Sequence, residues 1–230
     1  MKIILKPAGL AIVAAIMVTL IIIIVAPQGI GGGAKATPAT TPKAMMPSPQ
    51  TKPATGETKF PYTLETPGET LRNPGFEADY APIRPYDKTA TLHGKTAAHW
   101  YDDSSWAKIA INYARDDTAP HSGAFCQKIT VQQVTFGGCQ FVQPLRLTPG
   151  RTYTGGLWLR APRPTVVHVL LRKAAQPAVT YSVTDATVGP KWQPVSTTGT
   201  IGPDGVTYLV LSLDKAGSVW VDDATLTARK

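Results

Sequence analysis

The sequence lacks several features that mark common classes of enzyme. It has only two cysteines, and it contains neither a G-x-S-x-G nucleophile motif nor an H-E-x-x-H zinc motif. Its adjacent aspartates, such as Asp102-Asp103 and Asp116-Asp117, point to opposite faces of an extended backbone. A glycosidase instead needs two carboxylates that face each other across the sugar. We therefore predict that the chain is not an enzyme.

Clustered basic residues are also missing. The formal net charge of the chain is +8, but residues 1–60 carry +5 of it and residues 61–230 only +3. No run of lysine and arginine suggests a surface that follows the phosphates of a nucleic acid. The composition therefore excludes nucleic acid as an expected partner.

One long uncharged stretch stands near the start of the chain. The segment Ala8–Ala26 is apolar apart from a single threonine. As a helix, its nineteen residues rise ~29 Å, close to the ~30 Å hydrocarbon core of a bilayer. Lys2 and Lys6 precede it, which favours a cytoplasmic N-terminus. We predict a signal anchor, a single transmembrane helix within residues 1–30, with the rest of the chain in the periplasm or on the cell surface.

A cleaved signal peptide is the alternative interpretation of this stretch. The apolar run is longer than a usual signal-peptide core, and the small-x-small site Ala34-Lys35-Ala36 lies well beyond its end. No cysteine follows the run closely, so a lipoprotein is not expected. The uncleaved anchor is therefore the favoured prediction, and the cleaved form stays open.

The remaining chain divides by composition into a linker and a folded domain. Residues 31–60 are rich in alanine, threonine and proline, cannot bury a core, and are expected to be a disordered linker. Residues 61–230 carry short alternating strands with turn signals every 8–12 residues, a pattern typical of an all-β sandwich or barrel. The expected strands are 107–113, 125–131, 141–147, 153–160, 165–172, 180–188, 194–200, 206–213 and 218–227.

The two ends of this domain carry its most distinctive stretches. At the first end, Asn73-Pro74-Gly75 predicts a turn in which Gly75 takes a positive φ, followed by Phe76 as a core residue and Glu77 as a carboxylate. At the other end, Val219-Trp220-Val221-Asp222-Asp223 alternates like a strand, so at least one of its carboxylates faces inward.

Together with His121-Ser122-Gly123 and the pattern P-G-x-x-Y-x-x-x-x-W at residues 149–158, these stretches resemble a carbohydrate-binding module of the galactose-binding-like jelly-roll type. Modules of this type occur beside xylanase, glucanase and arabinofuranosidase domains. The resemblance covers roughly residues 68–228. It implies a jelly-roll β-sandwich and a polysaccharide or oligosaccharide as the partner.

A structural calcium ion is the cofactor that this resemblance implies. The resemblance implies Glu77 and Asp222 as the calcium ligands, with Asp223 as a further ligand and main-chain carbonyls near Ser122-Gly123 completing the site. Carboxylate and carbonyl oxygens are the ligands that calcium prefers. The alternative is that these carboxylates are surface or turn residues without a metal.

Candidate sugar-binding residues follow from strand alternation and from exposed aromatic side chains. Trp158 and Arg160 share one strand face, and His168 lies on the next strand. Trp106 and Tyr101 lie in or near a loop rich in serine and aspartate, where an aromatic ring has little local core to join. These five residues are the predicted carbohydrate contacts, although Trp158 equally suits a core position.

The two cysteines, Cys126 and Cys139, flank a plausible hairpin around residues 132–134, and an exported domain permits a disulfide. Strand alternation opposes the bond, because the two side chains fall on different faces unless a bulge at Gly137-Gly138 realigns them. The sequence leaves this disulfide open, since geometry decides it.

A second functional hypothesis belongs to another class. The same β-sandwich serves protein contact in an accessory or scaffold subunit of a membrane complex. The small residues Gly9, Ala11, Ala14 and Ala15 offer a stripe on which such a membrane helix could pack against another. An exposed aromatic surface flanked by polar groups favours sugar instead.

Overall fold

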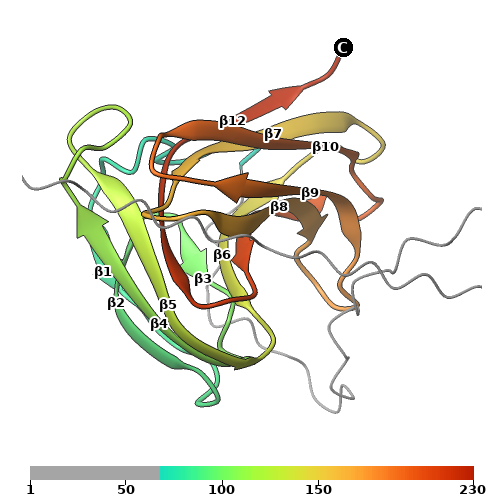
Figure 1. The fold of residues 1–230 in the computed structure, drawn as a ribbon. Helices are drawn as coiled ribbons and strands as arrows, with labels where there is room; N and C mark the ends of the chain where they lie inside the picture. The colour runs from blue at the N-terminus through green and yellow to red at the C-terminus, as the bar shows by residue number, and fades with distance from the viewer. Residues whose placement is uncertain (1–67) are drawn as a thin grey trace, which may run out of the picture. The chain divides into compact units, whose positions relative to one another are not determined.

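The computed structural model describes residues 68–230, which form two β-sheets packed face to face (Figure 1). The expected membrane segment 1–30 and linker 31–60 lie outside the described residues. Within residues 68–230, no helix is long and apolar enough to cross a bilayer. The strands are β1 (Tyr80–Pro82), β2 (Thr91–Ala97), β3 (Tyr101–Asp102), β4 (Lys108–Asp116), β5 (Cys126–Phe136), β6 (Cys139–Arg146), β7 (Thr152–Arg160), β8 (Thr165–Lys173), β9 (Thr180–Val188), β10 (Gln193–Thr200), β11 (Val206–Leu213) and β12 (Gly217–Ala228).

The strands are shared between a seven-stranded and a five-stranded sheet. The larger sheet has the order β1-β2-β4-β5-β12-β7-β10, and the smaller has the order β3-β6-β11-β8-β9. Neighbouring strands are antiparallel except for β2 and β4, which pair in parallel. This arrangement confirms the prediction of an all-β sandwich.

Strand alternation decides which side chains form the core. In β7, Leu157 and Leu159 are buried between the sheets, while Trp158 and Arg160 point outward, as the sequence predicts. The central strand β11 is apolar on both of its faces. Its residues Leu209 and Leu211 join the main core, whereas Tyr208 and Val210 belong to a second apolar cluster on the other side of the sheet.

Four aromatic rings join the first stretch of the domain to both sheets. Phe76 is fully buried and stacks on Trp100 with a centroid distance of 4.9 Å. Trp100 stacks in turn on Phe141 of β6 at 5.2 Å, and Tyr113 of β4 contacts Phe141 at 5.8 Å. Burial of such rings supplies several kcal/mol of stabilisation, so Phe76 is a core residue as predicted.

The turn before Phe76 differs from its prediction. Asn73 (φ 47°) and Phe76 (φ 58°) take the left-handed conformation that was expected for Gly75. Asparagine tolerates this region because its short amide can bond to nearby backbone. Here Asn73 Oδ1 accepts the N–H of Ala78 at 3.0 Å, and Asn73 Nδ2 donates to the carbonyl of Ala98 at 3.2 Å.

The disulfide that the sequence left open does not form. Cys126 and Cys139 are both buried free thiols, and burial raises the pKa of each to about 12. Cys126 begins β5, and Cys139 begins β6 just beyond the far end of β5, so ~33 Å of extended strand separates them along the chain. No hairpin forms at residues 132–134, because β5 continues to Phe136 in the seven-stranded sheet and the chain then passes through Gly137-Gly138 into β6 of the five-stranded sheet.

A buried polar network lies between the two sheets at Asp102. This side chain is 1% exposed; its Oδ1 accepts the Tyr113 hydroxyl at 2.6 Å, and its Oδ2 accepts the Ser104 N–H at 2.9 Å. Burial raises the pKa of Asp102 from 3.8 to about 6, although the Tyr113 and Ser104 hydrogen bonds oppose the rise. The folded state therefore holds a proton on Asp102 at a pH where the unfolded chain has lost it.

This pKa predicts a pH dependence of stability. The contribution of the protonated Asp102 is fully present below pH ~4 and is lost as pH rises through ~6, which amounts to about 3 kcal/mol. Asp102→Asn should remove that part of the slope, because its amide oxygen can accept the Ser104 N–H while its NH2 group donates to the Tyr113 hydroxyl, and the amide does not titrate. Urea unfolding of wild type and variant between pH 4 and 7 measures the difference. A constant difference in unfolding free energy across this range would contradict the prediction.

Candidate functional site

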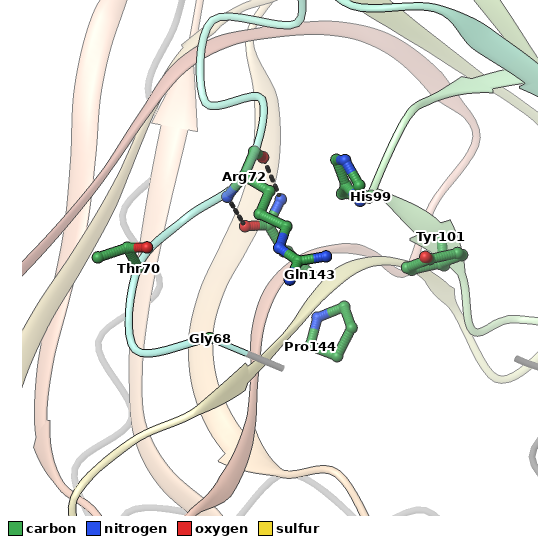
Figure 2. A pocket seen from close by; sticks show the side chains of 7 residues that line it. All are labelled: Gly68, Thr70, Arg72, His99, Tyr101, Gln143 and Pro144. Carbon is green, nitrogen blue, oxygen red and sulfur yellow. Dashed lines mark hydrogen bonds between the residues drawn. The ribbon is translucent and has the colours of Figure 1, made fainter. Parts of the chain in front are cut away.

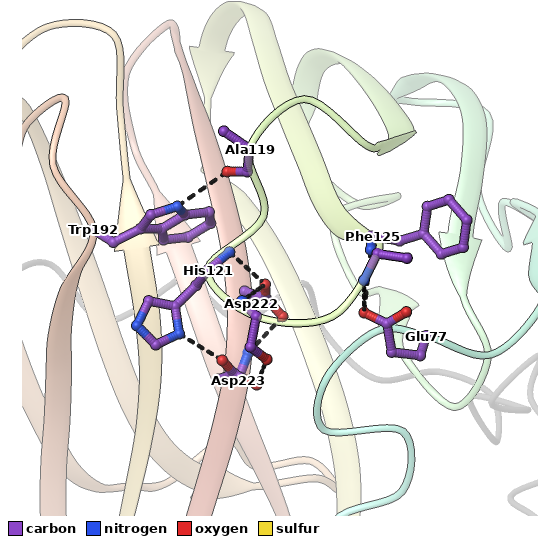
Figure 3. A network of polar contacts seen from close by, with 9 residues as sticks. Glu77, Ala119, His121, Phe125, Trp192, Asp222 and Asp223 are labelled. Atoms are coloured by element: carbon purple, nitrogen blue, oxygen red, sulfur yellow. Dashed lines mark hydrogen bonds and ion pairs between the residues drawn. The ribbon is translucent and has the colours of Figure 1, made fainter.

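The loop 117–125, which joins β4 to β5, lies against the last strand of the domain (Figure 3). Asp222 Oδ2 accepts the backbone N–H groups of His121 at 2.9 Å and Ser122 at 3.2 Å. Asp223 binds the same two residues through their side chains, with His121 Nδ1 at 2.5 Å and Ser122 Oγ at 2.9 Å. Both carboxylates of the predicted pair therefore hold one loop.

A bulge makes this double contact possible. Adjacent residues of a regular strand point to opposite faces, but the pairing of β12 with β7 shifts between Asp222 and Thr225. Asp223 takes a φ of 40° within this bulge, so its carboxylate turns toward the loop beside that of Asp222. Alternation alone could not predict that both side chains serve one site.

Glu77 contacts the same loop from the first stretch of the domain (Figure 3). Its Oε1 accepts the N–H groups of Ala124 at 3.0 Å and Phe125 at 3.1 Å. Gly123 permits the close approach, since it has a φ of 62° and a Cβ there would lie 2.1 Å from Glu77 Oε1. The three carboxylates predicted as metal ligands thus gather on loop 117–125.

The fit of this site to calcium follows from its oxygen chemistry. Glu77, Asp222 and Asp223 supply the hard oxygen donors that calcium prefers. Within residues 68–230, no three histidine, cysteine or acidic side chains are arranged as a metal-binding group. A calcium ion here would therefore need main-chain carbonyl or water ligands besides Glu77 and Asp222. Burial raises the pKa of Asp222 to about 6, although the backbone N–H groups of Asp223, Ser122 and His121, which donate to this carboxylate, oppose the rise.

The predicted residues Trp158 and Arg160 hold the other side of this loop. The ring of Trp158 stacks on His121 at a centroid distance of 3.8 Å. The Arg160 guanidinium lies between the rings of Trp192 (5.1 Å) and Trp220 (4.3 Å), and it donates to the carbonyl of Thr118 at 2.7 Å. This aromatic and cationic cluster lies on the side of the seven-stranded sheet that is turned away from the core.

The opposite surface of the domain is the side of the five-stranded sheet turned away from the core, here called the outer face. Strand pairing arranges its side chains in rows that cross the strands. Three successive rows can be followed along β8. The first, through His168, is polar; the second, through Leu170, is apolar; and the third places Tyr208 beside Arg172. The polar row is Gln140, Ser212, His168 and Asp185, and the apolar row is Tyr101, Val142, Val210, Leu170 and Val183.

Arg172 crosses this outer face. The Arg172 side chain extends from β8 across β11. Its guanidinium forms an ion pair with Asp103 and donates a 2.8 Å hydrogen bond to Gln140 Oε1. The guanidinium also lies 5.0 Å from the ring centroid of Tyr208. Its Nε is buried without a hydrogen-bond partner among the described residues.

His168 is the second residue on the outer face with a buried nitrogen that lacks a hydrogen-bond partner among the described residues. It is 7% exposed, and its Nδ1 lies 2.8 Å from Asp185 Oδ1 on β9. Its Nε2 is buried and lacks a hydrogen-bond partner among the described residues, with Asp214 Oδ1 at 3.6 Å. Asp185 and Asp214 are about half exposed, so this group lies just below the surface.

A small pocket opens at the edge of this sheet (Figure 2). Arg72 and Gln143 close one side of it through two hydrogen bonds, in which the Arg72 N–H donates to Gln143 Oε1 and Gln143 Nε2 donates to the Arg72 carbonyl, both at 2.8 Å. The lining residues are Gly68, Thr70, Arg72, His99, Tyr101, Gln143 and Pro144. The pocket extends the outer face beyond Tyr101.

The five predicted sugar contacts therefore occupy three places. Tyr101 and His168 share the outer face, whereas Trp158 and Arg160 lie on the opposite sheet. Trp106 is half-buried in the loop before β4, with its Nε1 bonded to the Asp103 carbonyl at 2.9 Å and its ring edge-on to Phe136. The structure adds Asp103, Gln140, Arg172, Asp185 and Asp214, which are not among these five. Two of them carry a signal in the sequence: Arg172 shares a strand face with His168, and Gln140 is a lesser polar candidate for contact with a sugar.

Comparisons with known proteins relate this fold to one class. No protein-family model matches the chain, and no curated protein sequence matches it. Among solved structures, CBM4 has a TM-score of 0.54 at 18% identity, covering 70% of this chain and 100% of its own. A Bacteroides thetaiotaomicron protein, for which sugar binding has been suggested, has a TM-score of 0.52 at 13% identity with the same coverage. The chain thus has the fold of carbohydrate-binding modules.

The contact between Gly123 and Glu77 generates a prediction. Gly123→Ala should destabilise the domain more than Gly150→Ala, because both glycines have a positive φ (62° and 74°) but only position 123 faces a carboxylate. The shared backbone strain costs ~1–2 kcal/mol, and the clash should add ~1–3 kcal/mol at Gly123. Urea unfolding measures both changes. Removing the carboxylate with Glu77→Ala should abolish the excess, and equal costs at the two glycines would contradict the contact.

Proposed function

We propose that this chain is a non-catalytic carbohydrate-binding protein of the galactose-binding-like jelly-roll type. It holds a polysaccharide or oligosaccharide on the outer face of the five-stranded sheet. The fold it shares with carbohydrate-binding modules supports the class of ligand. The side chains of the outer face support the location.

The observation that carries this proposal is a pair of unsatisfied nitrogens. His168 Nε2 and Arg172 Nε are both buried on the outer face without partners among the described residues, and they belong to residues four positions apart on β8. Such groups cost about 1–3 kcal/mol each unless a partner satisfies them. The hydroxyl groups of a sugar can both donate and accept, so one glycan can satisfy both nitrogens.

The apolar row completes the chemistry of a sugar site. Tyr101, Leu170 and Val183 belong to the row between those of His168 and Arg172. Val183 is 47% exposed and Tyr101 and Leu170 are half-buried, whereas Val142 and Val210 of the same row are buried. A sugar ring presents C–H surface on its faces and hydroxyls around its edge. An apolar row flanked by polar groups therefore suits a glycan better than it suits a fully polar or fully apolar ligand.

Two arginines offer a matched test of the location. Arg172 and Arg160 each carry a buried Nε without a partner among the described residues, but they lie on opposite faces of the sandwich. Arg172→Lys keeps the charge beside Asp103 and removes the Nε–H donor. It should weaken glycan binding by roughly 10- to 150-fold, the equivalent of ~1.5–3 kcal/mol, while Arg160→Lys should leave it unchanged.

Isothermal titration of the full-length chain with xylohexaose, cellohexaose and β-1,4-galactotriose measures these effects. Loss of binding in Arg160→Lys alone would move the site to the cluster around Trp158. Failure of wild type to bind these or any other glycan on an array would favour the alternative, an accessory subunit of a membrane complex.

We also propose that calcium is the structural cofactor, held through Glu77 and Asp222. An ion that binds only the folded state at a hundredfold excess over its Kd adds about 2.7 kcal/mol, which raises the melting temperature by very roughly 5–10 °C. Glu77→Gln should abolish the response to calcium, whereas the exposed control Glu69→Gln should retain it. Thermal melts with calcium and with a chelator measure the shift, and identical melts would exclude the ion.

The location of the domain is part of the proposal. The apolar run Ala8–Ala26 supports a single-pass anchor with the domain outside the membrane. The full-length protein should then stay with membranes after carbonate washing. Recovery of a mature protein that begins between Ala26 and Ala36 would instead show cleavage.

A further inference from the structure

The environment of His168 contains two carboxylates from different elements. Asp185 comes from β9, and Asp214 comes from the turn between β11 and β12. One faces each nitrogen of the ring, with Asp185 Oδ1 at 2.8 Å from Nδ1 and Asp214 Oδ1 at 3.6 Å from Nε2. The first distance is a hydrogen bond, and the second is too long for one.

The first contact decides the tautomer of the neutral ring. An ionised carboxylate only accepts hydrogen bonds, so Nδ1 must carry the proton that it shares with Asp185. In neutral His168, Nε2 is therefore a bare acceptor. It faces a second acceptor, Asp214 Oδ1, and neither atom can satisfy the other.

Two acceptors side by side require two donors. A single hydroxyl donates only one proton and can satisfy one of them. A vicinal diol on a sugar ring presents two hydroxyls at a comparable separation, so one can donate to His168 Nε2 and the other to Asp214 Oδ1. Asp214 is half exposed at the surface, and the buried Nε2 of His168 lies 3.6 Å from it.

Protonation changes this arrangement. When Nε2 gains a proton, it becomes a donor aimed at Asp214, and the ring bridges two carboxylates as a cation. The acceptor that the diol needs then no longer exists. Arg172, two rows away on β8, forms an ion pair with Asp103 and donates to Gln140 in the row of His168, while Ser212 and Gln140 are themselves uncharged and Lys215 follows Asp214 in its turn.

Building on the proposed carbohydrate function, we propose that His168 and Asp214 form a diol-binding subsite that works only while His168 is neutral. Asp185 is a positioning residue, since it fixes the proton on Nδ1. Acidification of the surroundings therefore releases the glycan, and a glycan bound at this subsite holds the imidazole in its neutral form.

Binding measurements across pH test the subsite. The full-length chain is titrated with xylohexaose, cellohexaose and β-1,4-galactotriose from pH 8 to pH 5. The apparent Kd should rise about tenfold for each pH unit below the titration midpoint of the imidazole, because only the neutral fraction binds. His168→Gln should show no such rise, while His93→Gln, an exposed control on β2, should keep the wild-type profile.

A second variant, Asp214→Asn, tests the acceptor pair itself and leaves the titrating ring of His168 in place. Its amide N–H can donate to neutral Nε2 and occupy the acceptor, so binding should weaken at least tenfold even at pH 8. Retention of full affinity in this variant, or of the pH profile in His168→Gln, would overturn the subsite.

Nitrogen NMR of the wild-type protein gives a readout that does not depend on any variant folding. The neutral ring of His168 should carry its proton on Nδ1, and a saturating oligosaccharide should lower the titration midpoint of that ring, as reciprocal linkage requires. An unchanged midpoint with sugar bound would overturn the inference but leave the proposed function standing. Absence of binding to all three oligosaccharides at pH 8 would overturn both.

Discussion

The stack of Phe76, Trp100, Phe141 and Tyr113 is the contact on which the arrangement of the domain depends. It joins the stretch before β1 to a ring from each sheet, with centroid distances of 4.9–5.8 Å. Aromatic rings bury more apolar area than other side chains, so their contacts dominate a core of this size. With Phe76 placed here, Glu77 must lie at the surface beside loop 117–125.

The two faces of the sandwich use similar residues for different purposes. On the seven-stranded sheet, Trp158 and Arg160 hold loop 117–125 through stacking and a hydrogen bond. On the five-stranded sheet, Arg172 and His168 are held by carboxylates while each keeps one nitrogen unsatisfied. Polar atoms oriented by neighbours but without partners of their own are prepared for a ligand, since binding need not first order them.

Much of the fold could be predicted because the two-residue alternation of side chains along a β-strand is visible in a short stretch of sequence. The nine strands expected after residue 106 correspond to β4–β12, and the outward positions of Trp158 and Arg160 are as alternation requires. Strands β1–β3 were missed because proline interrupts β1 and because β2 and β3 have little regular alternation. The turn residue was assigned to Gly75, since glycine is the usual choice, but tertiary bonds to the Asn73 side chain decide it.

The sequence by itself determined that the domain is all-β, that Leu157 and Leu159 face opposite to Trp158 and Arg160, and that Phe76 belongs to the core. Only the tertiary structure decided which distant residues meet. Asp222 and Asp223 reach one loop because of a bulge, and the cysteines lie apart because β5 runs to Phe136. His168, Asp185 and Asp214 come together through the order and register of β8, β9 and β11. Alternation is set by neighbours in the chain, whereas register is set by bulges and strand order, which no short pattern records.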